Sequence, residues 1–184
     1  MKIASLTALS LLASLAHAEA PASKALAQEA ASLIPPFQQE LLQTVKTAIS
    51  EGGPAQAVEA CNLLAPQIAA QHSEVPWQVG RTALKVRNPD NAPDAWERQV
   101  LERFAERAAA GEPLEQLRHG EVVGNEYRYL QAIGTAQPCL GCHGERIDPQ
   151  LLSLIDERYP TDQARGFSEG DLRGAFSLRR ALAH

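Results

Sequence analysis

Apolar residues in the N-terminal third of the chain recur at the spacing of amphipathic helices. The first stripe covers residues 26–48 and is interrupted by Pro35-Pro36, so it predicts two helical pieces that end at Gly52-Gly53. A second stripe predicts a helix over residues 53–70, with a buried face that carries Val58, Cys61, Ala65 and Ile68. Pro66 predicts a kink one turn beyond that cysteine.

The second half of the chain alternates between apolar and polar residues, as half-buried strands do. Strands are predicted over residues 79–86 and 172–179, and a hairpin over residues 121–133 turns at Gly124-Asn125. Between them, a helix is predicted to begin at Pro93-Asp94 and to end at Gly111. Helices followed by mostly adjacent antiparallel strands indicate the α+β fold class.

The first residues have the pattern of an export signal. Lys2 precedes an apolar run of 13 residues, which is followed by the triplet Ala16-His17-Ala18. A helix needs about 20 residues to cross a bilayer, so the run predicts a signal peptide, residues 1–18, and not a membrane anchor. We expect cleavage after Ala18 and a single periplasmic domain, residues 19–184, that does not span the membrane. The formal charge of -5 gives no reason to expect nucleic acid as a partner.

Cys139-Leu140-Gly141-Cys142-His143 matches the C-x-x-C-H pattern of c-type haem attachment. In that chemistry each thiol adds to a porphyrin vinyl group, and the adjacent histidine lies under the iron. A thioredoxin-like dithiol does not need the histidine, and no second cysteine pair completes a zinc site. The motif therefore predicts one covalent haem c, bonded through Cys139 and Cys142, with His143 as an iron ligand.

The sixth iron ligand is not fixed by the motif. Met1 is the only methionine and belongs to the predicted signal peptide, which excludes the His/Met pair of common electron carriers. The remaining donors are Cys61, His72, His119 and His184, and an open site is the further alternative. Cys61 is predicted to point inward, and a free thiol in an oxidising compartment is expected to be buried or bound.

Several separated segments together resemble a known family. They are residues 59–69 (EACNLLAPQIA), residues 79–97 (VGRTALKVRNPDNAPDAWE), residues 138–144 (PCLGCHG) and the tail over residues 159–177. The chain resembles the PAS-like single-haem c-type sensor domains, which occur as lone exported proteins and as the sensing part of membrane histidine kinases. The resemblance implies a PAS-like antiparallel sheet flanked by helices, with an N-terminal helical segment. It also implies iron held between His143 and the thiolate of Cys61.

Two further pairs of residues are candidates for haem contact. Arg81 and Arg87 share one face of the predicted strand region with Lys85 and are candidates for pairing with haem propionates, a solvated face being the alternative. Tyr127 and Tyr129 project from one face of the predicted hairpin. They are candidates for packing on the haem, and core packing is the alternative.

The expected function is a haem-based sensor of redox state or of a small diatomic ligand, since a thiolate ligand is displaceable. The alternative is a low-potential periplasmic electron carrier with a redox partner protein, because an anionic thiolate stabilises ferric iron. An enzyme is not expected, as no distal acid–base pair is recognisable in the sequence.

Overall fold

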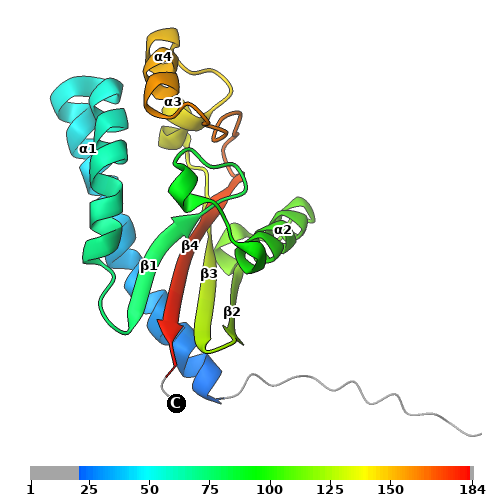
Figure 1. The fold of residues 1–184 in the computed structure, drawn as a ribbon. Helices are drawn as coiled ribbons and strands as arrows, with labels where there is room; N and C mark the ends of the chain where they lie inside the picture. Colours follow the sequence, from blue (N-terminus) through cyan, green and yellow to red (C-terminus); the bar gives the residue numbers. More distant parts are fainter. Residues whose placement is uncertain (1–20, 183–184) are drawn as a thin grey trace, which may run out of the picture.

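The computed structural model describes residues 21–182. It confirms the α+β prediction of an antiparallel sheet flanked by helices, with a helical segment at its N-terminal end (Figure 1). The predicted signal peptide, residues 1–18, and the candidate ligand His184 lie outside the described residues. Along the described part of the chain, no helix is long and apolar enough to cross a membrane.

The N-terminal segment α1 (Pro21–Gln71) consists of two helices that meet at Gly52-Gly53. Gly53 has φ 73°, a conformation that glycine adopts without steric cost. The second helix returns beside the first, so that the His72 ring lies 5.5 Å from the Phe37 ring. Figure 1 shows this reversal between the blue-to-cyan and the teal parts of α1.

The prediction that Pro35-Pro36 divides the first helix is wrong. Within α1 only Gly52 and Gly53 depart from helical dihedral angles, so neither this proline pair nor Pro66 breaks the helix. Ile34 and Phe37, on either side of the pair, are buried in the main core. Burial of these two side chains outweighs the backbone hydrogen bonds that the prolines remove.

The sheet has the strand order β1-β4-β3-β2, and every neighbouring pair is antiparallel. Its strands are β1 (Trp77–Thr82), β2 (Arg118–Val123), β3 (Glu126–Gly134) and β4 (Leu172–Ala181). The predicted hairpin is β2–β3, in which Gly124 at the turn has φ 62°. The predicted first strand is too long at its C-terminal end, because β1 ends at Thr82 and leaves Lys85 and Arg87 in the following loop.

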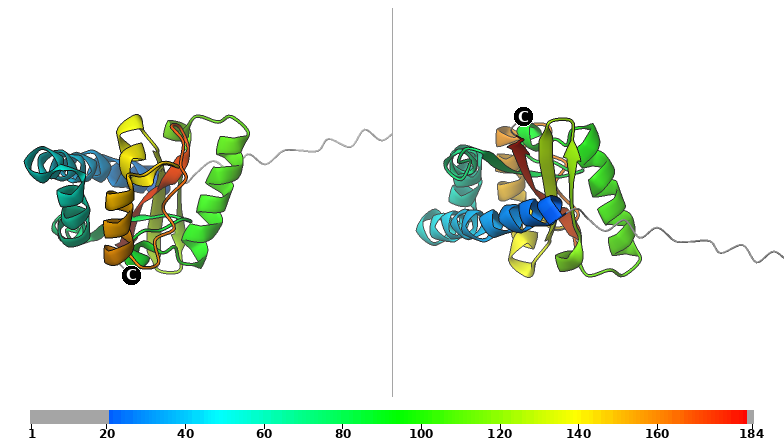
Figure 2. Two further views of the ribbon diagram at one scale, coloured as in Figure 1. Left: turned by 90° about the horizontal axis from the view of Figure 1, so that it is seen from above. Right: turned by 90° about the horizontal axis from the view of Figure 1, so that it is seen from below.

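Helices cover both faces of the sheet, as the two views of Figure 2 show. α1 packs on one face, where the main core includes Phe37, Trp77 and Phe176. The other face carries α2 (Ala95–Ala109), which buries Val100, Leu101 and Phe104. The helix start predicted from Pro93-Asp94 has a capping box, in which Asp94 and Glu97 each bind the other's backbone N–H.

The remaining elements lie near one end of the sheet. They are the 3-10 helices η1 (Pro89–Asn91), η2 (Leu114–Gln116) and η3 (Gln137–Cys139), the single turn α3 (Leu140–His143), and α4 (Pro149–Arg158). α4 packs against α1 and was not predicted. Its signals are Asp148, which caps the helix, Pro149 in its first turn, and the apolar pair Leu151 and Ile155.

Candidate functional site

The C-x-x-C-H motif forms a short helical turn. Cys139 ends η3, and α3 contains both Cys142 and His143. Three residues of helical spacing bring the two thiols to the same side of the turn, and both cysteines are half-buried. α3 ends at Gly144, where a Cβ atom would lie 2.6 Å from the Leu140 carbonyl oxygen. The glycine after the motif thus allows a close backbone approach.

His143 is held as a neutral imidazole with a defined orientation. Its Nδ1 atom lies 2.8 Å from the Ala164 carbonyl oxygen, so this nitrogen carries the proton and donates it. Burial, followed by the charges of Arg173 and Arg87, lowers the pKa of His143 to about 3. The lone pair of Nε2 is therefore available to a metal ion.

The backbone of residues 164–167 supports the motif. Phe167 N–H donates to the His143 carbonyl at 3.0 Å, and Gly166 N–H donates to the Gly144 carbonyl at 3.1 Å. These bonds belong to a parallel bridge between Gly144 and Phe167. The Phe167 ring also meets the His143 ring edge-on, with the centroids 6.4 Å apart. The histidine is thus fixed through both its backbone and its ring.

Arg87 joins this support to the motif. Its Nη2 atom donates to the Cys142 carbonyl at 2.6 Å, and Nε and Nη2 bind Asp162 at 3.2 and 3.1 Å. Burial raises the pKa of Asp162, but hydrogen bonds from Arg87 and Arg165 outweigh it, so the pKa lies below its usual value. Arg87 and Asp162 therefore form a charged pair within the site.

Cys61 lies on the second helix of α1, and its surroundings correct one prediction. Val58 and Ile68 of the predicted face are buried, but Cys61 itself is exposed. Loss of solvation still raises the pKa of its thiol, an effect that Arg81 opposes and Cys142 reinforces. The thiol is therefore recessed: protein surrounds it, while solvent reaches it. Helical periodicity cannot distinguish such a position from a packed one.

Side chains of α4 and of Tyr159, the residue after it, hold the Cys61 helix. Val58 packs with Leu151, Ile155 and Tyr159 in one apolar cluster. The Tyr159 side chain is hydrogen-bonded to Asn62, the residue after Cys61. Glu59 accepts a hydrogen bond from Arg158 at 2.7 Å. The cysteine is thus positioned through its neighbours on the helix.

The other candidate ligands among the described residues lie elsewhere. His72 follows the last turn of α1, and its Nε2 atom lies 2.7 Å from a Glu40 carboxylate oxygen. His119, on the edge strand β2, pairs with Glu121 at 3.0 Å and its ring contacts Trp96. Both rings therefore have partners outside the His143 region.

Arginine side chains gather around the motif. Arg81 of β1 and Arg173 of β4 form no salt bridge with any of residues 21–182. Burial, followed by repulsion from Arg87 and Arg81, lowers the pKa of Arg173 to about 10. Burial also lowers the pKa of Arg81. This positive charge suits carboxylate groups of a ligand. Arg81 was predicted from the sequence but Arg173 was not; its one signal is its place at the start of the final strand β4.

Tyr127 and Tyr129 lie in the main core, next to α1. Tyr127 meets Trp77 edge-on with centroids 6.3 Å apart, and the Tyr129 hydroxyl binds Gln131 at 3.2 Å. In the strand register, Arg81 is opposite Phe176, while Tyr129 is opposite Leu178. The tyrosines therefore lie further down the sheet than Arg81, in the core packing that the sequence left as an alternative.

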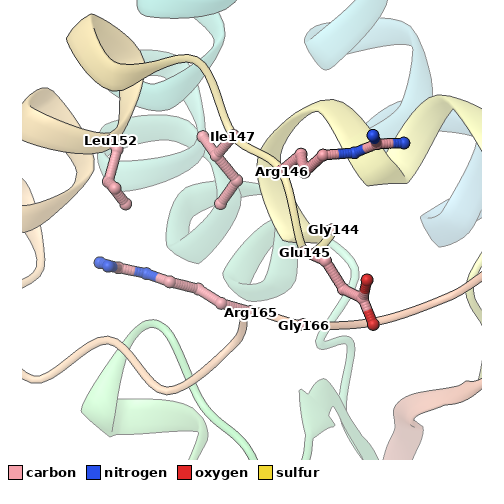
Figure 3. Close-up of a pocket in the computed structure, with 7 residues that line it drawn as sticks. All are labelled: Gly144, Glu145, Arg146, Ile147, Leu152, Arg165 and Gly166. Atoms are coloured by element: carbon pink, nitrogen blue, oxygen red, sulfur yellow. The ribbon is translucent and has the colours of Figure 1, made fainter.

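An open pocket of about 600 Å³ lies beside the motif (Figure 3). Its lining comprises Gly144, Glu145, Arg146, Ile147, Leu152, Arg165 and Gly166. In Figure 3, Ile147 and Leu152 lie across from Arg165. Neither the three cysteines nor His143 contributes to the lining. The pocket is thus separate from the candidate ligands.

The residues present fit a covalent haem. Two accessible thiols have the required spacing, a neutral imidazole follows them, and two arginines without carboxylate partners lie nearby. The fold and this arrangement define a class: α+β domains with a C-x-x-C-H turn and an N-terminal helical hairpin.

The chain belongs to the Tll0287-like family, whose sequence model matches residues 13–180. This confirms the family resemblance found in the sequence. A solved structure, that of the cyanobacterial heme-protein Tll0287, is similar with a TM-score of 0.60 and 26% identity. The likeness covers 88% of this chain and 97% of that chain. None of the curated proteins matches this chain.

Proposed function

We propose that this protein is an exported single-haem c-type cytochrome that senses redox state or a small ligand in the periplasm. Cys139 and Cys142 would bind the haem covalently, and His143 and the thiolate of Cys61 would hold its iron. When bound, haem supplies an iron that changes its oxidation state and can exchange one ligand.

Haem binding is supported by the motif, by the neutral His143 ring with its proton on Nδ1, and by the relative. The relative is described as a heme-protein and spans nearly all of this chain. The hydrogen bond from Nδ1 to the Ala164 carbonyl leaves Nε2 for the iron, as in other metal sites where a hydrogen-bond acceptor orients the imidazole. Arg81 and Arg173 supply positive charge for the haem propionates.

Cys61 is favoured as the second ligand because its thiol interacts electrostatically with Cys142, whereas His72 and His119 are engaged elsewhere. Binding to iron requires the thiolate. Arg81 favours that form, opposing the loss of solvation that raises the thiol pKa.

A single observation carries the sensing role: the described contacts that hold the Cys61 helix are made by Val58, Glu59 and Asn62, and none of them is made by the thiol. The thiol can therefore move without breaking those contacts. Cys61 would link the haem to the helix that Arg158, at the end of α4, and the following Tyr159 contact. A change at the ligand can thereby alter the packing of α1 against α4.

The test has two stages. Haem staining of the denatured protein and intact-mass analysis should reveal one covalent haem on the processed chain; an unmodified polypeptide mass would reject the proposal. Visible and electron-spin-resonance spectra of the ferric form should then have a low-spin thiolate pattern. Nitric oxide or carbon monoxide is expected to bind with loss of that pattern. Retention of both ligands in either oxidation state, with rapid exchange with an electron donor, would favour the electron carrier.

A further inference from the structure

Arg87 binds several protein groups at once, whereas a side chain kept free for a ligand would bind few. Its side chain is 11% exposed, and it pairs with Asp162, whose side chain is fully buried. Its Nη2 atom also lies 2.6 Å from the Cys142 carbonyl and 3.3 Å from the Ala164 carbonyl. These carbonyls belong to the residue before His143 and to the residue that accepts the His143 proton.

We propose that Arg87 is a positioning residue for the axial histidine, an inference that rests on the proposed function. Arg87 holds the Ala164 carbonyl at the place where His143 Nδ1 donates to it. Through the Cys142 carbonyl, it also fixes the backbone from which the imidazole projects. This role differs from the propionate pairing that the sequence suggested for Arg87.

Asp162 completes the arrangement by binding the other backbone group of Ala164. One carboxylate oxygen accepts the Ala164 N–H at 2.9 Å and the Arg87 Nε–H at 3.2 Å. Ala164 is therefore bound at its N–H by Asp162 and at its carbonyl by Arg87. The planar guanidinium can reach the carboxylate and the two carbonyls at once, whereas a lysine ammonium presents one compact charge.

The expected consequence concerns electron donation by His143. A firm hydrogen bond at Nδ1 makes the imidazole a stronger donor at Nε2, which favours the ferric state. Loosening that bond should therefore raise the reduction potential. A purely electrostatic role of Arg87 predicts no change when the positive charge is kept. Arg87→Lys separates the positioning role from the electrostatic role. It keeps the positive charge but removes the planar guanidinium and its several N–H donors.

The experiment compares the wild-type holoprotein, R87K and the matched control R165K. Arg165 binds the same Asp162 carboxylate at 2.6 Å, but its side chain donates to neither the Cys142 nor the Ala164 carbonyl. In R87K we expect the ferric-to-ferrous ratio at a fixed potential to fall about tenfold, equivalent to about 59 mV for one electron. Exchange of the His143 Nδ1 proton, followed by NMR, should accelerate by about tenfold. R165K should resemble the wild type in both measurements.

The outcomes separate the two proposals. A wild-type chain without haem overturns the proposed function and this inference with it. A wild type that carries haem, together with R87K of unchanged potential and proton exchange, overturns the inference alone. If R87K does not fold, D162N is the second variant. Asparagine keeps the size of the side chain that pairs with Arg87 but removes its charge. Faster Nδ1 exchange in D162N supports the positioning role, and unchanged exchange overturns it.

Discussion

The two sides of the proposed haem site are built differently. On the His143 side, backbone hydrogen bonds from Gly166 and Phe167, the Ala164 carbonyl and the Arg87–Asp162 pair all act on one turn. On the Cys61 side, the donor lies on a helix and the described contacts reach its neighbours in the sequence.

This difference suits different tasks for the two proposed ligands. The histidine is held by buried groups, and its displacement would break several hydrogen bonds at once. The contacts described for the Cys61 helix are made by its neighbours, so movement of the thiol would leave them in place. One retained ligand and one releasable ligand are what the proposed sensor requires. The following predictions test that contrast, beginning with the largest expected effect.

Replacing both Cys139 and Cys142 with serine should abolish covalent haem attachment, because no thioether bond can form. Intact-mass analysis of the exported chain should then give the mass of the polypeptide alone. Cys61→Ser is the matched control and should keep the added mass. Equal loss of haem in the control would place Cys61 in the attachment chemistry and remove the contrast between the two sides.

Cys61→Ala should retain the covalent haem but lose the thiolate ligand. We expect the low-spin thiolate spectrum to disappear and the reduction potential to rise by about a few tenths of a volt, within the ~0.8 V range that axial ligands span. Leu63→Ala, on the same helix and 60% exposed, serves as the control and should leave the spectrum unchanged. A wild-type spectrum in the Cys61 variant would exclude the thiolate.

Asp162→Ala should destabilise the His143 side strongly, because it leaves Arg87 as an uncompensated, largely buried charge. Breaking such a pair costs about 3–5 kcal/mol of unfolding free energy, measurable by urea denaturation. Asp156→Ala removes the exposed one of the two carboxylate partners of Arg165, at a position that is 57% exposed, and should cost less than about 1 kcal/mol. Similar losses in both variants would argue against a buried support.

The same pair predicts an acid dependence. The pKa of Asp162 in the folded protein lies below its ordinary value of 3.8. Its contribution to stability is therefore fully present above pH 3.8 and is lost as the pH falls through the lower folded value. Urea unfolding of the wild type should weaken over that range. Asp162→Asn should reduce this dependence of the unfolding free energy on pH. An unchanged dependence would show that other carboxylates cause it.

Tyr159→Phe should have the smallest effect, about 1 kcal/mol, because it removes one hydrogen bond, to Asn62. Amide hydrogen exchange should accelerate around Cys61 and remain unchanged in residues 140–144. Asn62→Ala provides the double-mutant cycle, in which the two substitutions should not be additive. Exchange that increases equally on both sides of the site would show that the two supports form one unit.

Local signals predicted much of the architecture. The hairpin at Gly124-Asn125, the helix start at Asp94 and the end of the first helix at Gly52-Gly53 all depend on neighbouring residues, and all three are present. The helix break predicted at Pro35-Pro36 was wrong because the burial of Ile34 and Phe37 is a tertiary effect. The support of His143 was missed because its acceptor is the backbone carbonyl of Ala164, which leaves no signature in the side chain.

The sequence by itself determined the proposed attachment site, since two thiols and an imidazole must lie within five consecutive residues to serve one porphyrin. Only the tertiary structure decided which distant groups meet them. Cys61 and Arg87 reach the motif because α1 reverses at Gly52-Gly53 and the chain leaves the sheet after Thr82. Hydrogen bonds over such separations depend on the path of the whole chain, which no local pattern encodes.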